Sequence, residues 1–138
     1  FGSGLHFRGF YLNNELTDFT LTPEADGKPV ANRVEGGKRP RSSMAPTVVY
    51  DAQGRIVLVI GAAGGPTIPV TVARGIIGVL DFKLGAQDAL ALPFAMSFGD
   101  SLLVEEGTAL AAMQDALAAL GHKGIRLAPA PIKANALG

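Results

Sequence analysis

The uninterrupted apolar stretch IVLVI at positions 56–60 is the feature that most constrains the fold of this 138-residue chain. Every position in the stretch is apolar, which predicts a strand buried on both faces. The preceding segment, PTVVYD, is also strand-like, and Asp51 and Gly54 supply turn chemistry between the two segments. The pair therefore predicts an antiparallel hairpin whose second strand lies in the centre of a sheet.

Two helices are predicted after this hairpin. Apolar residues recur at helical spacing at Val72, Ile76, Val79 and Leu80. Pro66 fits the first turn of that helix, where a missing N–H does no harm. A second, shorter helix is expected over AQDALAL and ends before Pro93.

The rest of the chain continues this alternation. SLLVEE predicts a strand, and TALAAMQDALAALG predicts a helix with Thr108 as its N-cap and Gly121 as its C-terminal stop. IRLAPAPIKA predicts one or two short strands, and FYL at 10–12 predicts a single short strand. The polar stretch 21–41 predicts a long surface loop. Strands partly arranged as hairpins and combined with helices predict an α+β layered fold with a mixed or antiparallel sheet.

Composition excludes several classes of function. Twelve basic residues balance twelve acidic ones, so nucleic acid and anionic membranes are not expected partners. The chain has no cysteine, and two histidines, His6 and His122, are too few for a histidine metal cluster. No P-loop or dinucleotide-binding glycine pattern is present, and the run GRIVLVIGAAGG is about half as long as a membrane-spanning helix. We expect one domain over residues 1–138, with no metal, cofactor or membrane span.

Two polar pairs could bind a ligand. Glu15 and Asp18 in NNELTDF could converge on an ammonium group, or Asp18 could merely stabilise a solvated turn. Ser42 and Ser43 in GKRPRSSMAPTVV could hold a carboxylate with neutral donors, which avoids the cost of burying a lysine. They could equally satisfy backbone groups where the loop meets the strand.

A glycine pair follows the apolar strand. Gly64 and Gly65 would let a ligand approach the backbone closely at the start of a helix, and Pro66 contributes no N–H. Two free amides beside a helix N-terminus are how an oxyanion hole is built. An ordinary strand-to-helix turn explains the glycines as well.

Four stretches in this order carry a family resemblance: FGSG, LNNELTDF, GKRPRSSMAPTVV and DAQGRIVLVIGAAGG. Together they resemble the small subunit of γ-glutamyltranspeptidases, which are self-cleaving N-terminal-nucleophile hydrolases. The resemblance covers residues 1 to about 80 well and fades afterwards. It implies part of a layered αββα sandwich, and a chain that is the C-terminal part of the small subunit, truncated at both ends.

The resemblance also implies a role for each pair. Glu15 and Asp18 would bind the α-amino group of a γ-glutamyl donor such as glutathione, and Ser42 and Ser43 its α-carboxylate. The Gly64 and Gly65 amides would stabilise the tetrahedral oxyanion. The acyl group would then pass to water or an amine. The expected partners are the large subunit and the N-terminal part of the small subunit, from the same precursor, and the expected location is periplasmic or secreted, with the cytoplasm still possible.

The chain departs from the family pattern in ways that matter for activity. The family's nucleophile is a threonine upstream of FGSG, whereas this chain starts at Phe1, so we expect it to be inactive alone. Thr67 stands where many members have arginine, and ALPFAMSFGD lacks the usual proline-arginine motif. Both changes bear on the choice of acceptor.

Other functions compete with this one. Within the same fold, an acylase for a glutaryl-type side chain would be favoured by loss of the acidic pair, which is present. A degenerate homologue or truncated domain that only binds or associates is the alternative from another class. A serine hydrolase using Ser43 with His6 or His122 is disfavoured, since no G-x-S-x-G elbow surrounds either serine.

Overall fold

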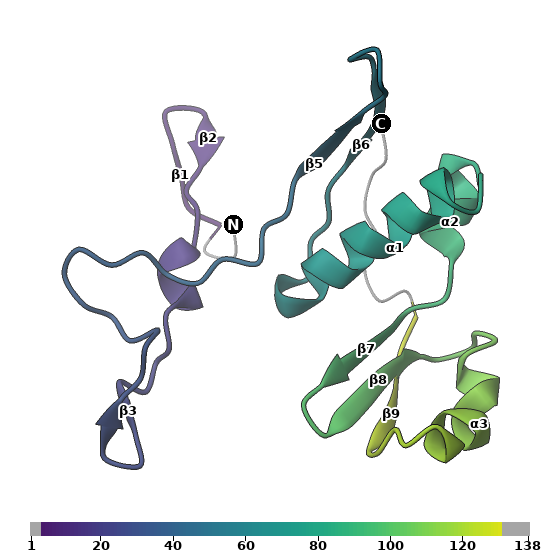
Figure 1. Ribbon diagram of the computed structural model, residues 1–138. Coiled ribbons are helices and arrows are strands. Elements are labelled where there is room, and N and C mark those ends of the chain that lie inside the picture. The colour runs from purple at the N-terminus through teal and green to yellow at the C-terminus, as the bar shows by residue number, and fades with distance from the viewer. Residues whose placement is uncertain (1–3, 131–138) are drawn as a thin grey trace. The chain divides into compact units, whose positions relative to one another are not determined.

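The computed structural model describes residues 4–130, and the chain divides into two compact units, Phe1–Ser42 and Ser43–Gly138 (Figure 1). Helices and strands are mixed in the second unit, which confirms the α+β class. The prediction of a single domain over residues 1–138 stays a prediction.

The first unit is built from short hairpins and a single helical turn. The elements are β1 (His6–Phe7), β2 (Phe10–Tyr11), the 3-10 helix η1 (Glu15–Asp18), β3 (Glu24–Ala25) and β4 (Lys28–Pro29). β1 pairs antiparallel with β2, and β3 pairs antiparallel with β4. Phe19 is the one buried hydrophobic residue among residues 4–42, so polar contacts rather than a core organise this unit.

The predicted long loop over 21–41 is wrong in its first part, which contains the β3–β4 hairpin. Asp26 and Gly27 connect the two strands, and their φ angles are 52° and 69°. Positive φ at both positions is the geometry of a type I′ turn, and Asp-Gly is a strong signal for it. The signal was in the sequence, but the strands beside it are too short to show alternation.

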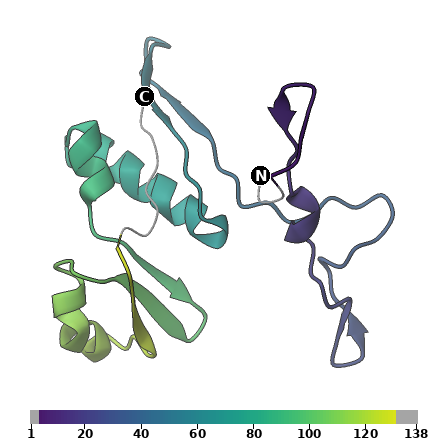
Figure 2. The ribbon, with the colours of Figure 1, turned by 180° about the vertical axis from the view of Figure 1, so that it is seen from behind.

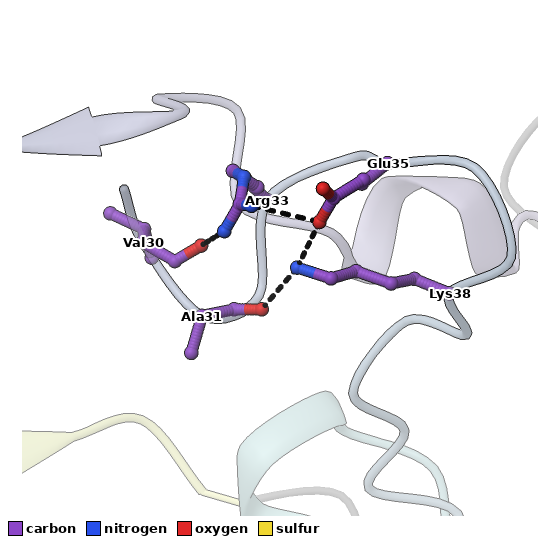
Figure 3. Close-up of polar contacts among 5 residues, drawn as sticks. All are labelled: Val30, Ala31, Arg33, Glu35 and Lys38. Atoms are coloured by element: carbon purple, nitrogen blue, oxygen red, sulfur yellow. Dashed lines mark hydrogen bonds and ion pairs between the residues drawn. The ribbon is translucent and has the colours of Figure 1, made fainter. Parts of the chain in front are cut away.

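The second part of the segment is a loop held by one carboxylate (Figure 3). Glu35 Oε2 lies 2.9 Å from Arg33 Nη2 and 2.8 Å from Lys38 Nζ. The same two cations donate to the carbonyl oxygens of Val30 and Ala31. The hydrogen bond from Lys38 and the charge of Arg33 lower the pKa of Glu35, because both favour the ionised carboxylate.

The second unit begins with the predicted hairpin. β5 (Thr47–Tyr50) pairs antiparallel with β6 (Ile56–Ile60). The turn is tied by Asp51, whose carboxylate accepts from the Gln53 and Arg55 amides and from Arg55 Nε at 2.7 Å. These bonds lower the pKa of Asp51. The prediction of an antiparallel hairpin is confirmed.

Burial of β6 on both faces, in contrast, is a wrong prediction. Leu58 and Ile60 are buried, but Val57 and Val59 are 48% and 42% exposed. Within the described residues β6 pairs only with β5, and α1 (Ile68–Leu80) covers the face that carries Leu58 and Ile60 (Figures 1 and 2). The alternate face of the strand therefore stays open.

The core of the second unit lies between this hairpin and α1. Its buried members are Leu58, Ile60, Ile68 and Val72. The 3-10 helix η2 (Gly65–Thr67) directly precedes α1. Pro66 was predicted in the first turn of the long helix and lies in η2. After α1 comes α2 (Ala86–Ala91), as predicted.

A three-stranded sheet follows. Its strands are β7 (Ala95–Phe98), β8 (Ser101–Glu105) and β9 (Ile125–Ala128). β7–β8 is antiparallel and β8–β9 is parallel, so the sheet is mixed, as expected. The parallel connection runs through η3 (Ala111–Met113) and α3 (Gln114–Ala119), which lie beside the sheet (Figures 1 and 2). The end of IRLAPAPIKA, from residue 131, lies outside the described residues.

The last helix is shorter than predicted. Thr108 is not its N-cap, because the Thr108 hydroxyl donates to the Glu105 carbonyl at 2.7 Å and closes the turn after β8. Gly121 does stop the helix: its N–H bonds to Ala118 and that of His122 to Leu117, with Gly121 at a φ of 95°. This pair of bonds is a Schellman motif, which a glycine makes favourable.

Candidate functional site

The acidic pair lies on η1, in the first unit. Side chains at i and i+3 eclipse in a 3-10 helix, so Glu15 and Asp18 extend from the same side of this turn. Asn13 Oδ1 accepts from the Glu15 amide at 3.0 Å, and the Thr17 hydroxyl donates to the Asn14 carbonyl at 2.7 Å. These local bonds stabilise the turn that carries the two carboxylates.

Ser42 lies beside this pair, although it is 27 residues further along the chain. Its Oγ donates to Glu15 Oε1 at 3.2 Å. A hydroxyl donor and a carboxylate acceptor are thus brought to neighbouring positions, with Ser42 and Asp18 exposed and Glu15 half-buried. A group carrying both an ammonium and a carboxylate could satisfy both at once.

Ser43 and the two glycines belong to the second unit. Ser43 is half-buried and follows Ser42 directly. Gly64 directly precedes η2 and Gly65 is its first residue, and their φ angles are 133° and 60°. The structure thus brings Ser42 to the acidic pair within the first unit, while Gly64 and Gly65 belong to the second unit.

The glycine turn has the features of an anion-binding backbone. A Cβ on Gly64 would lie 2.5 Å from Thr67 Oγ1, so only glycine fits there without a shift. Thr67 closes the turn, since its amide and hydroxyl both donate to the Gly64 carbonyl. Within residues 4–130 neither the Gly64 nor the Gly65 amide donates a hydrogen bond. Both amides precede the positive end of α1.

Sequence reasoning missed the residue that connects these parts of the first unit. Asn32 Nδ2 donates to the Asp18 carbonyl at 2.7 Å, and Asn32 Oδ1 accepts from the Arg41 amide at 3.0 Å. An asparagine in a Gly- and Pro-rich segment has no periodic neighbours that would single it out. Only the folded loop identifies it.

The described residues show no arrangement typical of a metal site or of a serine–histidine catalytic pair. No three His, Asp or Glu side chains gather to hold a metal ion within residues 4–130. His6 packs edge-on against Tyr11, and over the same residues no hydrogen bond joins a serine hydroxyl to His6 or His122. Nor is any helix in the described part of the chain long and apolar enough to cross a membrane.

A family model described as gamma-glutamyltranspeptidase matches residues 1–134. The chain belongs to the gamma-glutamyltranspeptidase family. The glutathione hydrolase proenzyme of Bacillus subtilis subsp. natto is 33% identical over 135 residues, which are 96% of this chain and 21% of that protein. The glutathione hydrolase proenzyme of Escherichia coli K12 is 34% identical and covers 93% of this chain and 23% of that protein.

Solved structures of the family agree with this assignment. An acivicin-inhibited gamma-glutamyltranspeptidase matches with a TM-score of 0.73 and 33% identity, over 91% of this chain and 69% of that chain. The Helicobacter pylori enzyme with the T380A mutation matches with a TM-score of 0.71 and 32% identity over the same shares. The fold is thus part of an N-terminal-nucleophile hydrolase fold, and the chain spans about a fifth of the length of these two curated relatives.

Proposed function

We propose that this chain supplies the donor-binding part of an enzyme that cleaves γ-glutamyl amides. The observation that carries the proposal is the 3.2 Å contact between Ser42 Oγ and Glu15 Oε1. It brings an anionic acceptor and a neutral donor together, as the ammonium and carboxylate of an α-amino acid require. In the free site the two groups hydrogen-bond to one another, and the head group of the donor takes over both roles when it binds.

Each pair then has a role in the reaction. Glu15 and Asp18 accept hydrogen bonds from the α-amino group, and Ser42 and Ser43 donate to the α-carboxylate. With the head group fixed, the γ-carbonyl is presented to a threonine hydroxyl from elsewhere in the precursor, whose own α-amine takes the proton. Attack forms a tetrahedral oxyanion, and the Gly64 and Gly65 amides stabilise its charge.

The rest of the reaction follows acyl-transfer chemistry. The C–N bond of the γ-glutamyl amide breaks as the leaving amine takes up the proton, which leaves an acyl-enzyme ester on the threonine. Water or an amine then attacks the ester and releases glutamate or a new γ-glutamyl amide. From the family resemblance alone, we place the intact protein in the periplasm or outside the cell.

The acidic pair provides the test. In the full-length protein, Asp18→Ala should raise the KM for a γ-glutamyl anilide by about tenfold or more, because a hydrogen bond to a charged group contributes about 1.5 to 3 kcal/mol. For a donor of the same length without the α-amino group, the variant should leave KM unchanged. Steady-state kinetics with the two donors measure both effects.

Glu24→Ala is the matched control, since Glu24 is an exposed acid on β3 of the same unit. It should leave both KM values unchanged. Equal losses with the two donors in Asp18→Ala would mean that Asp18 supports the fold and does not bind the amine.

A further inference from the structure

The Asn32 side chain has partners at both ends of its amide. Nδ2 donates to the Asp18 carbonyl at 2.7 Å and approaches Thr20 Oγ1 at 3.3 Å. Oδ1 accepts from the Arg41 amide at 3.0 Å. The backbone carbonyl of Asn32 accepts from the Thr20 amide at 2.9 Å, which fixes the residue against the segment after η1.

These partners are the immediate neighbours of the candidate donor-binding groups. Asp18 is the last residue of η1, which carries the acidic pair, and Arg41 directly precedes Ser42. One side chain thus spans the two segments, 14 residues from Asp18 and 9 from Arg41 in sequence. With Phe19 as the one buried hydrophobic residue within residues 4–42, no apolar core fixes this spacing.

We propose that Asn32 is a positioning residue for the donor's head group, a role that rests on the proposed function. Its two-ended hydrogen bonding holds η1 at a fixed distance from Ser42, so that Glu15, Asp18 and the serine hydroxyl meet one ammonium and one carboxylate together. Small displacements of such groups are costly, because a shift of about 1 Å can lower activity about a hundredfold.

The same loop contains a matched control. Glu35 orders residues 30–38 through Arg33 and Lys38, but neither contact reaches η1 or Ser42 (Figure 3). Glu35→Gln therefore disturbs the loop without disturbing the link that Asn32 provides. A residue that merely stabilises the loop would behave as Glu35 does.

The test is a double-mutant cycle in the full-length protein with a γ-glutamyl anilide. Asn32→Ala should raise donor KM about fivefold or more, with a smaller change in kcat, and the rise should shrink to about twofold or less in an Asp18→Ala background. Glu35→Gln should leave KM unchanged. Asn32→Asp keeps the acceptor for the Arg41 amide but loses the donor to the Asp18 carbonyl. It should therefore raise KM as Asn32→Ala does. This variant replaces Asn32→Ala in the test if the alanine variant does not fold.

Amide hydrogen exchange gives a readout apart from activity. Asn32→Ala should speed exchange of the Arg41 amide about tenfold, since it removes the acceptor, whereas Glu35→Gln should not. Three results would overturn the inference: additive effects on KM in the double mutant, an unchanged KM in both Asn32 variants, or unaltered exchange of the Arg41 amide. The proposed function would still stand in each case if Asp18→Ala raises KM as expected. If Asp18→Ala also leaves KM unchanged, the proposed function fails and the role of Asn32 fails with it.

Discussion

The positive φ angle of Gly65 determines what a Gly65→Ala variant can show about the proposed oxyanion hole. Its φ is 60°, and no atom lies within 4 Å of the position a Cβ would take. An alanine there has room but must adopt a left-handed conformation, which costs about 1 to 2 kcal/mol. A loss of stability in Gly65→Ala would therefore say nothing about the oxyanion hole, and only a kinetic comparison can.

Gly54→Ala is the matched control for that comparison. Gly54 has a φ of 77°, also with open space around it, and lies in the β5–β6 turn. Both variants should lose similar stability in the full-length protein, but only Gly65→Ala should lower kcat, by about a hundredfold. Alanine keeps the amide N–H, but its methyl group would hold the oxyanion away from that donor, and the loss should be on the scale of one missing oxyanion hydrogen bond. Thermal unfolding and steady-state kinetics measure the two effects. Equal kcat values in the two variants would contradict the oxyanion role and indicate that the glycine turn is only structural.

The residues of the candidate site were named from the sequence, and their roles stay predictions. The sequence motifs contain the two polar pairs, Glu15 with Asp18 and Ser42 with Ser43, and the family resemblance alone implies that they bind an amino acid head group. The contact between Ser42 and Glu15 depends on how the intervening loop returns to η1, and Asn32 hydrogen-bonds to both ends of that return. Single polar residues in irregular segments have no pattern from which to predict such a path.

At the scale of elements, α1 packs through two glycines that behave differently. A Cβ on Gly78 would lie 2.9 Å from Ala89 Cβ and 3.1 Å from Ala89 Cα, on α2. A Cβ on Gly75 would meet the end of the Ile60 side chain and no backbone atom. Glycine at position 78 therefore allows α1 and α2 to approach closely. Position 75 is expected to accept a larger side chain at a lower cost.

Alanine substitutions should separate the two positions. Gly78→Ala should destabilise the full-length protein by about 1 to 3 kcal/mol, because overpacking outweighs the helix propensity of alanine. Gly75→Ala should change stability by less than about 1 kcal/mol, since the gain in propensity offsets the displaced Ile60 tip. Chemical denaturation measures both. A Gly78→Ala variant more stable than the unmodified protein would show that α1 and α2 can separate enough to accommodate the methyl group.

Predictability of the elements follows their length and period. α1 has 13 residues with apolar positions at helical spacing, and the β5–β6 hairpin has two apolar segments joined by turn residues, so both were predicted. β3 and β4 have two residues each and were not predicted. β7 was missed because AMSF begins two residues after Pro93 and has no clear alternation. The end of α3 was predicted from Gly121, but its start was not, since Thr108 serves the preceding turn instead.

At the scale of the whole molecule, the proposed reaction needs a nucleophile outside this chain. The 138-residue chain alone should release no chromophore from a γ-glutamyl anilide, because Ser42 and Ser43 are assigned to substrate binding and no threonine here is assigned to attack. The full-length protein should release it. Turnover by the purified chain above the level of a Ser42→Ala, Ser43→Ala variant would contradict the proposal and favour a serine mechanism.

The open face of β6 has a consequence for handling the chain by itself. Val57 and Val59 lie exposed on a strand of five apolar residues, without charge or proline, and each strand of the described β5–β6 hairpin has one unpaired edge. Such a segment is a template for cross-β self-association, in which identical strands stack edge to edge. A preparation of this chain alone is therefore at risk of forming fibres through residues 56–60, and a lysine at Val57 or Val59 would act as a gatekeeper against them.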